Sequence, residues 1–168
     1  MRVGEFQLPE ELVALIEAGK WPRNLHEANQ QNLRSLAPEE RIQLLAPEEC
    51  RLFLYYPPFG TAASILSREE VGGFYRRFGA VDQIVPEATV EIGDFGLGSD
   101  APIALDYRNG PTEPRVIRLL WATGGNRWVE MAPDNVIVAR PSGLTLSGGA
   151  MAARNASAYR PMIFDREL

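Results

Sequence analysis

Three runs of strand-forming residues between residues 103 and 132 constrain the fold of this chain more than any other feature. The runs cover 103–108, 114–121 and 127–132, and each is rich in aliphatic and aromatic side chains. The turns that separate them, at 109–111 and 124–126, are short and contain Gly and Asn. Short turns of this composition join neighbouring strands that run antiparallel. We therefore expect an antiparallel three-stranded meander.

The register of this meander predicts a structural role for Asp106. If the second hairpin is symmetric about Gly124, Arg118 faces Glu130, and a nearly symmetric first hairpin brings Asp106 beside Arg118. Opposite charges that face each other across two strands stabilise a sheet by roughly 0.2 to 1 kcal/mol. We therefore expect a cross-strand ion pair between Asp106 and Arg118. In this register Trp128 lies on a mixed face with Arg118 and Glu130, and such a face suits binding better than burial.

The first half of the chain favours helices. The tripeptide Pro-Glu-Glu occurs three times, and proline followed by acidic residues is typical of a first helical turn. We expect helices over 9–18 and 38–45, whereas 24–36 is ambiguous between helix and loop. Residues 52–56 are predicted as a strand that ends at two prolines.

The strongest helix signal covers 67–78. Ser67 and Glu70 have the spacing of a capping box, and Gly79 is placed to end the helix. Apolar side chains follow at the spacing of one helical face, at Val71, Phe74, Tyr75 and Phe78. We expect this face to pack against the rest of the protein.

Size and composition indicate one globular domain over 1–168. The chain is 45% hydrophobic and 23% charged, as ordinary globular proteins are. Its net charge of −5 disfavours a nucleic-acid partner, because phosphate contacts need clustered basic residues. Only Lys20 among the 17 basic residues is lysine, which favours a GC-rich, bacterial coding sequence. Residues 140–168 are rich in Gly, Ala and Ser, and we expect a diverged or loosely ordered tail there.

Cysteine content and hydropathy favour a cytoplasmic protein. Cys50 is the only cysteine, so an internal disulfide is excluded, and we expect it to be a small buried side chain. The first residues lack the apolar core of a signal peptide, and no apolar stretch is long enough to span a membrane. We expect no contact with a membrane.

Three aspartates, Asp94, Asp100 and Asp106, surround a glycine-rich turn and raise the question of a metal site. Too few oxygen ligands follow Asp94 for a calcium loop, and the glycines lack the spacing of a nucleotide-binding loop. The only histidine, His26, is remote in sequence from Cys50, so a nucleophile with its base is not indicated. We therefore predict no catalytic residue, no metal and no cofactor.

The sequence from residue 91 to 134 resembles the SUKH superfamily, which includes fungal regulators of cell-wall synthesis of the Smi/Knr type and many bacterial toxin-immunity proteins. The most specific parts of the resemblance are IGDFGLG at 92–98, IALD at 103–106 and WVEMAP at 128–133. The resemblance is weaker over 52–90, and after residue 134 the chain departs from the family pattern. It implies an α+β fold with N-terminal helices packed on a central, mostly antiparallel sheet, and a non-enzymatic role.

These observations lead to a functional hypothesis. We expect a protein-binding domain, most simply an immunity protein that neutralises a toxin domain by binding it. The candidate contact residues are Asp94, Asp100, Trp128 and Glu130, with Asp106 as scaffold or interface. Two alternatives stay open, namely a regulatory adaptor and a small metal-dependent hydrolase that uses the three aspartates. The sequence makes no prediction of the oligomeric state or of the toxin's activity.

Overall fold

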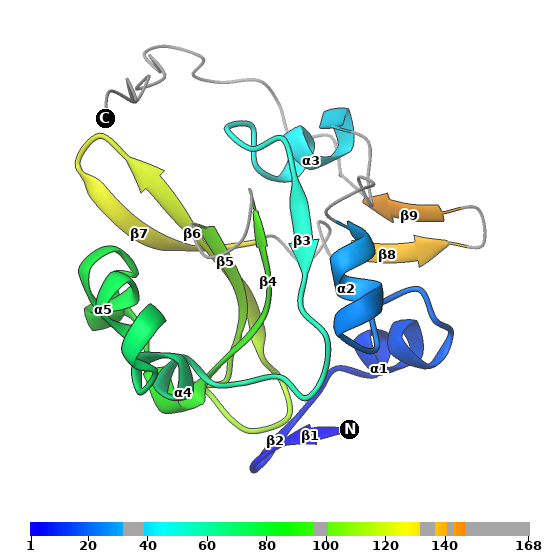
Figure 1. Ribbon diagram of the computed structural model, residues 1–168, viewed down its shortest axis with the longest axis horizontal. Helices are drawn as coiled ribbons and strands as arrows, with labels where there is room; N and C mark the ends of the chain where they lie inside the picture. The colour runs from blue at the N-terminus through cyan, green and yellow to red at the C-terminus, as the bar shows by residue number, and fades with distance from the viewer. Residues whose placement is uncertain (32–38, 96–100, 132–136, 141–142, 147–168) are drawn as a thin grey trace.

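The computed structural model describes residues 1–31, 39–95, 101–131, 137–140 and 143–146 (Figure 1). Helices and strands alternate irregularly along the chain, and two short 3-10 turns cover Val81–Gln83 and Pro86–Ala88. The helices are α1 Glu10–Glu17, α2 Leu25–Gln31, α3 Glu39–Leu45, α4 Ala62–Leu66 and α5 Glu69–Phe78. The strands are β1 Arg2–Val3, β2 Phe6–Gln7, β3 Leu52–Leu54, β4 Thr89–Phe95, β5 Ala101–Asp106, β6 Arg115–Ala122, β7 Gly125–Glu130, β8 Ile137–Arg140 and β9 Gly143–Leu146.

The main sheet has five strands in the order β3-β4-β5-β6-β7, and every neighbouring pair is antiparallel. The predicted meander is confirmed as β5, β6 and β7, and the α+β class with a mostly antiparallel sheet is confirmed with it. Two small hairpins, β1–β2 and β8–β9, form separate sheets (Figure 1). The tail beyond residue 146 lies outside the described residues.

The predicted register of the meander is wrong by one residue at the second hairpin. Ala122 pairs with Gly125, so the turn contains two residues and is not centred on Gly124. Because side chains alternate between the faces of a strand, this shift moves Arg118 to the face opposite Glu130. Arg118 pairs with Val129, and its guanidinium forms an ion pair with Glu48 instead.

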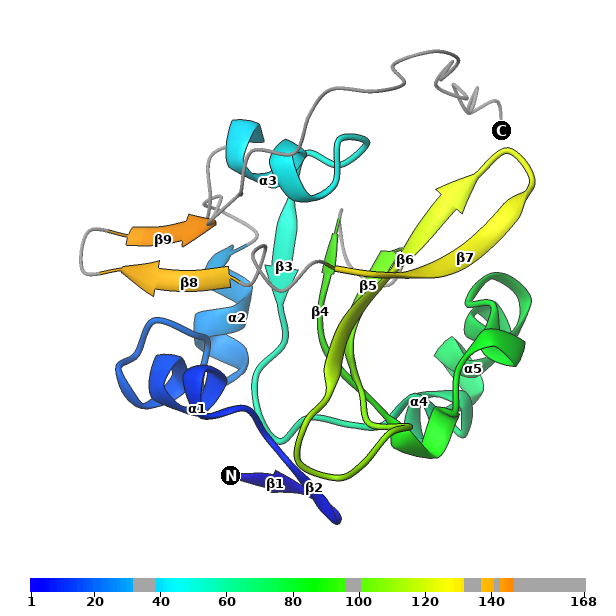
Figure 2. The ribbon, with the colours of Figure 1, turned by 180° about the vertical axis from the view of Figure 1, so that it is seen from behind.

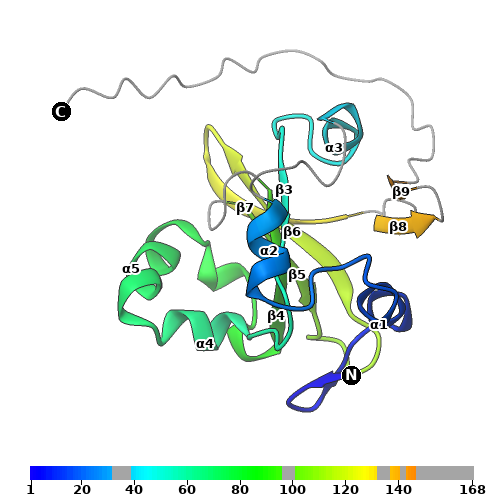
Figure 3. The ribbon, with the colours of Figure 1, turned by 45° about the vertical axis from the view of Figure 1, so that its right-hand side comes forward.

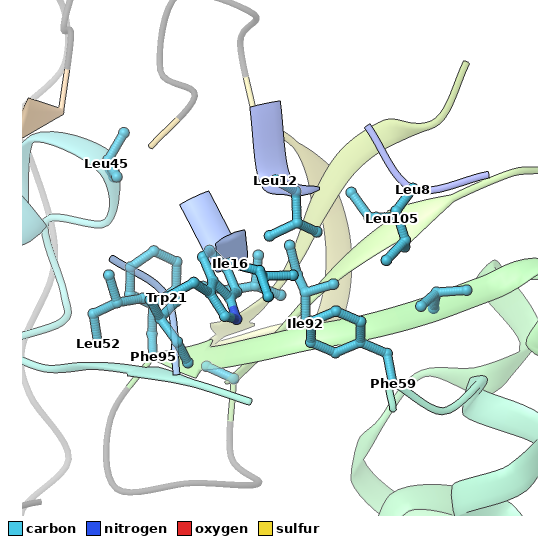
Figure 4. Close-up of a cluster of buried hydrophobic side chains, with 14 of the residues drawn as sticks. Leu8, Leu12, Ile16, Trp21, Leu45, Leu52, Phe59, Ile92, Phe95 and Leu105 are labelled. Atoms are coloured by element: carbon cyan, nitrogen blue, oxygen red, sulfur yellow. The ribbon is translucent and has the colours of Figure 1, made fainter. Parts of the chain in front are cut away.

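Both faces of the sheet are covered by apolar side chains. On one face Ile103 and Leu105 share a cluster with Leu12 and Ile16 of α1 (Figure 4). On the other face lies a second cluster, which joins Ala104 and Ile117 of the sheet to Ala62 of α4 and Tyr75 of α5. Figure 3 shows α1 on one side of the sheet and the α4–α5 pair on the other. As a result, β4 and β5 are buried along their whole length.

The helix predicted over 67–78 is present, but its predicted capping box is wrong. Helix α5 begins after Arg68, and Ser67 instead ends α4, where its hydroxyl donates to the carbonyl of Ser64 at 2.7 Å. The sequence pattern missed α4, which is capped by Thr61. A side chain at Gly72 would lie 2.4 Å from the carbonyl oxygen of Leu66, so glycine allows α4 and α5 to approach closely.

Two further expectations concern single segments. The ambiguous segment 24–36 contains helix α2, which covers Leu25–Gln31, and residues 32–36 lie outside the described residues. Cys50 is exposed, so its predicted burial is wrong. The core contacts of this region come from Ile42 and Leu45 of α3 and from Ala46 directly after it, and the chain has left the core by Cys50. In the described parts of the chain, every helix is too short or too polar to cross a membrane.

Strands β3 and β7 form the two edges of the main sheet (Figure 2). At each edge, one glutamine side chain pairs with two backbone groups of the strand. On β3, the amide of Gln31 donates to the carbonyl of Leu54 at 2.8 Å and accepts from the N–H of Leu54 at 3.1 Å. On β7, the amide of Gln83 donates to the carbonyl of Asn126 at 3.1 Å and accepts from the N–H of Trp128 at 3.0 Å. Each carboxamide thus makes the pair of bonds that another strand would make.

The β3 edge gives a direct test of this arrangement. Gln31 is buried, so Gln31→Leu leaves both backbone groups of Leu54 buried and unpaired, and we expect it to lower the free energy of unfolding by about 2 to 4 kcal/mol. Gln30→Leu, at the exposed neighbouring position of α2, is the matched control and is expected to change stability by less than about 0.5 kcal/mol. Urea denaturation of the two variants measures both values, and equal stabilities would contradict the role of Gln31.

Candidate functional site

Asp94 lies inside the sheet, where it ties β4 to β5. It is fully buried, pairs with Phe53 on one side and Pro102 on the other, and its Oδ2 accepts a hydrogen bond from the N–H of Ala101 at 3.2 Å. This hydrogen bond connects Asp94 to the first residue of β5, so its carboxylate has a structural role. Asp100 lies outside the described residues.

Asp106 is the buried centre of an ion-pair network whose other members are partly exposed. Its Oδ2 lies 2.7 Å from Nε of Arg108 and 2.7 Å from Nη2 of Arg115, and Arg115 reaches Glu130 at 3.1 Å. The predicted ion pair between Asp106 and Arg118 is wrong, because Asp106 lies opposite Arg115 in the register and Arg118 lies opposite Ile103. Asp106 forms its cross-strand ion pair with Arg115 instead. Burial raises the pKa of Asp106, but hydrogen bonds from Arg108 and Arg115 outweigh it and bring the pKa below its usual value.

The two described aspartates do not converge. Asp94 lies opposite Pro102, and Asp106 is four residues further along the same strand, which is about 13 Å at the rise of a β-strand. One metal ion cannot bind both carboxylates across that distance. Among the residues that the structure describes, no group of three or more His, Cys, Asp or Glu side chains is placed to hold a metal ion.

Trp128 and Glu130 have different environments on β7. The indole of Trp128 packs against the second cluster, and its Nε1 donates to the carbonyl of Gly79 at 2.9 Å, so it fastens the hairpin to the end of α5. The side chain of Glu130 is 50% exposed. Of the described candidate residues, Glu130 is therefore the most accessible to a partner.

A cavity of about 530 Å³ lies between α2, the segment that follows β3, and the α4–α5 pair. Its volume is in the range of small-molecule sites. Aromatic side chains dominate its wall, namely Phe53, Tyr55, Tyr56, Phe59 and Tyr75. Two charged residues, Glu91 and Arg68, also line it, Glu91 being 4% exposed.

The carboxyl of Glu91 is the unusual feature of this cavity. Within the part of the chain that the structure describes, neither its Oε1 nor the hydroxyl of Tyr75 has a hydrogen-bond partner. Burial raises the pKa of Glu91 to about 7, against the opposing effects of Tyr75 and Arg68. Burial also raises the pKa of Tyr75, as does the nearby charge of Glu91. The two groups therefore influence each other without forming a well-shaped hydrogen bond.

Sequence reasoning missed this site. Its lining residues come from three segments that are far apart in the chain, and the sequence predicts only a strand over 52–56 that ends at two prolines. The available signal was Glu91 itself, which is a lone carboxylate between Val90 and Ile92. In a strand buried on both faces, such a residue needs a partner.

Comparison with models of protein families, with curated proteins and with solved structures finds no match. The resemblance of 91–134 to the SUKH superfamily therefore stays a prediction.

The Asp106 network predicts a stability change that depends on pH. Asp106→Asn removes the charge that Arg108 and Arg115 bind, and we expect it to lower the free energy of unfolding by about 1 to 3 kcal/mol at neutral pH. Because the pKa of Asp106 is lowered by folding, this contribution is present above the ordinary aspartate pKa and is lost as the pH falls through the folded value. Denaturation at neutral and acidic pH measures the change, and Glu130→Gln, at the exposed end of the network, is a control expected to cost little.

Glu91 predicts the opposite dependence. Its pKa is raised from 4.5 to about 7, so only the folded state holds the proton between these values, and stability falls as the pH rises through this window. We expect Glu91→Gln to remove most of this penalty and to be more stable than the wild type above pH 7, by up to about 3 kcal/mol. Thermal unfolding of both proteins across the window measures the difference, and parallel curves would show that Glu91 titrates normally.

Proposed function

We propose that this chain is a non-enzymatic protein-binding domain, and that it acts as an immunity protein which neutralises a toxin domain by binding it. The resemblance at 91–134 falls on β4 to β7, which are four of the five strands of the main sheet. The core supports the SUKH-like arrangement that this proposal includes, because Leu12 and Ile16 of an N-terminal helix share a cluster with Ile103 and Leu105 of the sheet.

A row of aromatic rings, with Phe74 exposed and the other two half-buried, carries the proposal. We call this row, made of Phe74, Phe78 and Trp121, the aromatic ridge. Its ring centres are 4.7 Å apart between the two phenylalanines and 5.6 Å apart between Phe78 and Trp121. Phe74 is 41% exposed, and the guanidinium of Arg77 lies 5.1 Å from the ring centre of Phe78. Exposed aromatic and arginine side chains are the residues that dominate binding energy at protein interfaces.

The sheet itself favours docking through side chains. Gln31 and Gln83 occupy backbone groups at both edges, so a partner that added a strand at these positions would have to displace them. The net charge of −5 favours a basic partner, and it acts mainly on the association rate. A basic nuclease domain would fit this description, and neutralisation would need only occlusion of its site.

The two alternative functions receive different support from the structure. A regulatory adaptor would use the same ridge, so only the identity of the partner separates it from an immunity protein. The geometry of the described aspartates does not favour the metal-dependent hydrolase, because Asp94 and Asp106 are separated by about 13 Å along the sheet and each is held by its own hydrogen bonds.

The proposal is tested with the full chain and the C-terminal domain of a toxin encoded beside its gene. We expect the two to co-purify and the chain to protect cells from the toxin. Phe74→Ala is expected to weaken binding at least about tenfold, because it truncates an exposed anchor. Leu44→Ala is the matched control, since Leu44 is 59% exposed on α3, which lies away from α5 in Figures 1 and 3. Absence of both binding and protection would overturn the proposal, and equal effects of the two variants would remove the ridge from it.

A further inference from the structure

The cavity between α2 and the α4–α5 pair combines two features that few apolar cavities share. Its wall presents the rings of Phe53, Tyr55 and Tyr56, and its buried polar atoms are Oε1 of Glu91 and the hydroxyl of Tyr75. Neither polar atom has a hydrogen-bond partner among the residues that the structure describes. The site therefore has hydrogen-bonding capacity that the described protein leaves unused.

The chemistry of these groups selects the kind of ligand. An anion is disfavoured by the carboxyl of Glu91, and a purely apolar molecule would leave Glu91 and Tyr75 buried without partners, which is costly. An ammonium group supplies three N–H donors and a positive charge. Aromatic faces attract such a cation, and they also bury the apolar stem that carries it.

The cavity's own cation does not fill this role. Arg68 lines the cavity and lowers the pKa of Glu91 through its charge, but its residue is exposed, and within the described chain no ion pair joins it to Glu91. The other titratable side chains that line the cavity in the described chain are Tyr55, Tyr56 and Tyr75, and Tyr55 adds to the raised pKa of Tyr75. A cation that enters the cavity would thus meet a carboxyl that forms no ion pair with the described residues and feels the charge of Arg68 only through space.

We propose that this cavity is a binding site for a primary ammonium group on an apolar stem, with Glu91 as its counter-ion, the Tyr75 hydroxyl as a second acceptor and the surrounding rings as the wall for the stem. The source of the ammonium group is either a free organic amine or the side chain of a lysine. This inference is independent of toxin neutralisation, because it concerns a different surface from the aromatic ridge.

The first test uses the wild-type protein and two probes of the same shape. Phenethylammonium carries the charge, and phenethyl alcohol is its neutral counterpart. Chemical-shift changes in a titration followed by NMR are expected to map to the cavity residues and to give a dissociation constant at least about tenfold lower for the ammonium probe. Equal affinities for the two probes, or shifts confined to other surfaces, would overturn the proposal.

The pH dependence of the same titration adds a readout that a merely apolar cavity would not show. The amine stays protonated up to about pH 8.5, since its pKa is close to that of lysine. Its affinity is expected to rise about tenfold or more between about pH 5.5 and about pH 8.5, as Glu91 ionises, while that of the alcohol stays constant. A flat profile for the ammonium probe would contradict the role of Glu91.

The variant Glu91→Gln tests the contribution of the carboxyl to binding while the rest of the cavity is unchanged. The amide has nearly the same shape, so the variant is expected to keep its affinity for the alcohol and to lose roughly ten- to a hundred-fold in affinity for the ammonium probe. Retained affinity for the ammonium probe would overturn the proposal. A parallel titration with the amide of N-acetyl-lysine distinguishes the two sources of the ammonium group. If this probe binds with the same dependence on Glu91, the natural ligand is a lysine side chain. If it does not bind while phenethylammonium does, the natural ligand is a free amine.

Discussion

The burial of β4 and β5 on both faces is the constraint on which the rest of this structure depends. Every residue of these two strands is buried, yet they carry three carboxyl groups, at Asp94, Asp106 and Glu91. A buried carboxyl needs partners, and the strands solve this in different ways. Asp94 receives a backbone N–H, and Asp106 receives two guanidinium groups. Glu91 instead lines a cavity. Asp94 and Asp106 are therefore interpreted as structural residues, and Glu91 as part of a candidate binding site.

The backbone groups at the edges of the sheet also need hydrogen-bond partners. A five-stranded open sheet has two edges with unpaired backbone groups, and here a glutamine amide completes part of each. The two positions are not equivalent in energy. Gln31 is buried, so water cannot replace its bonds, whereas Gln83 is exposed and shares its backbone groups with solvent. The β3 edge is therefore the more firmly closed of the two.

The sequence predicted what periodicity and turn residues control, and it failed where tertiary contacts decide. The strands of the meander and the helix that ends at Gly79 follow from local patterns, and the structure has them. The predicted register failed at both hairpins, because the number of residues in each turn decides which side chains face each other across the strands. The cavity was not predicted for a different reason, because only the folded chain brings Glu91 and Tyr75 to the same cavity.

Helix α5 carries residues of both proposed surfaces, and helix geometry explains how they stay separate. Val71 and Tyr75, four residues apart, line the cavity, while Phe74 and Phe78, also four apart, form part of the aromatic ridge. Adjacent residues on a helix point about 100° apart, so Phe74 and Tyr75 face different surroundings. The close approach of Gly72 to the carbonyl of Leu66 holds the helix against α4 and fixes both orientations together. A substitution on one face therefore leaves the other face in place, and binding at the ridge and binding in the cavity can be measured independently.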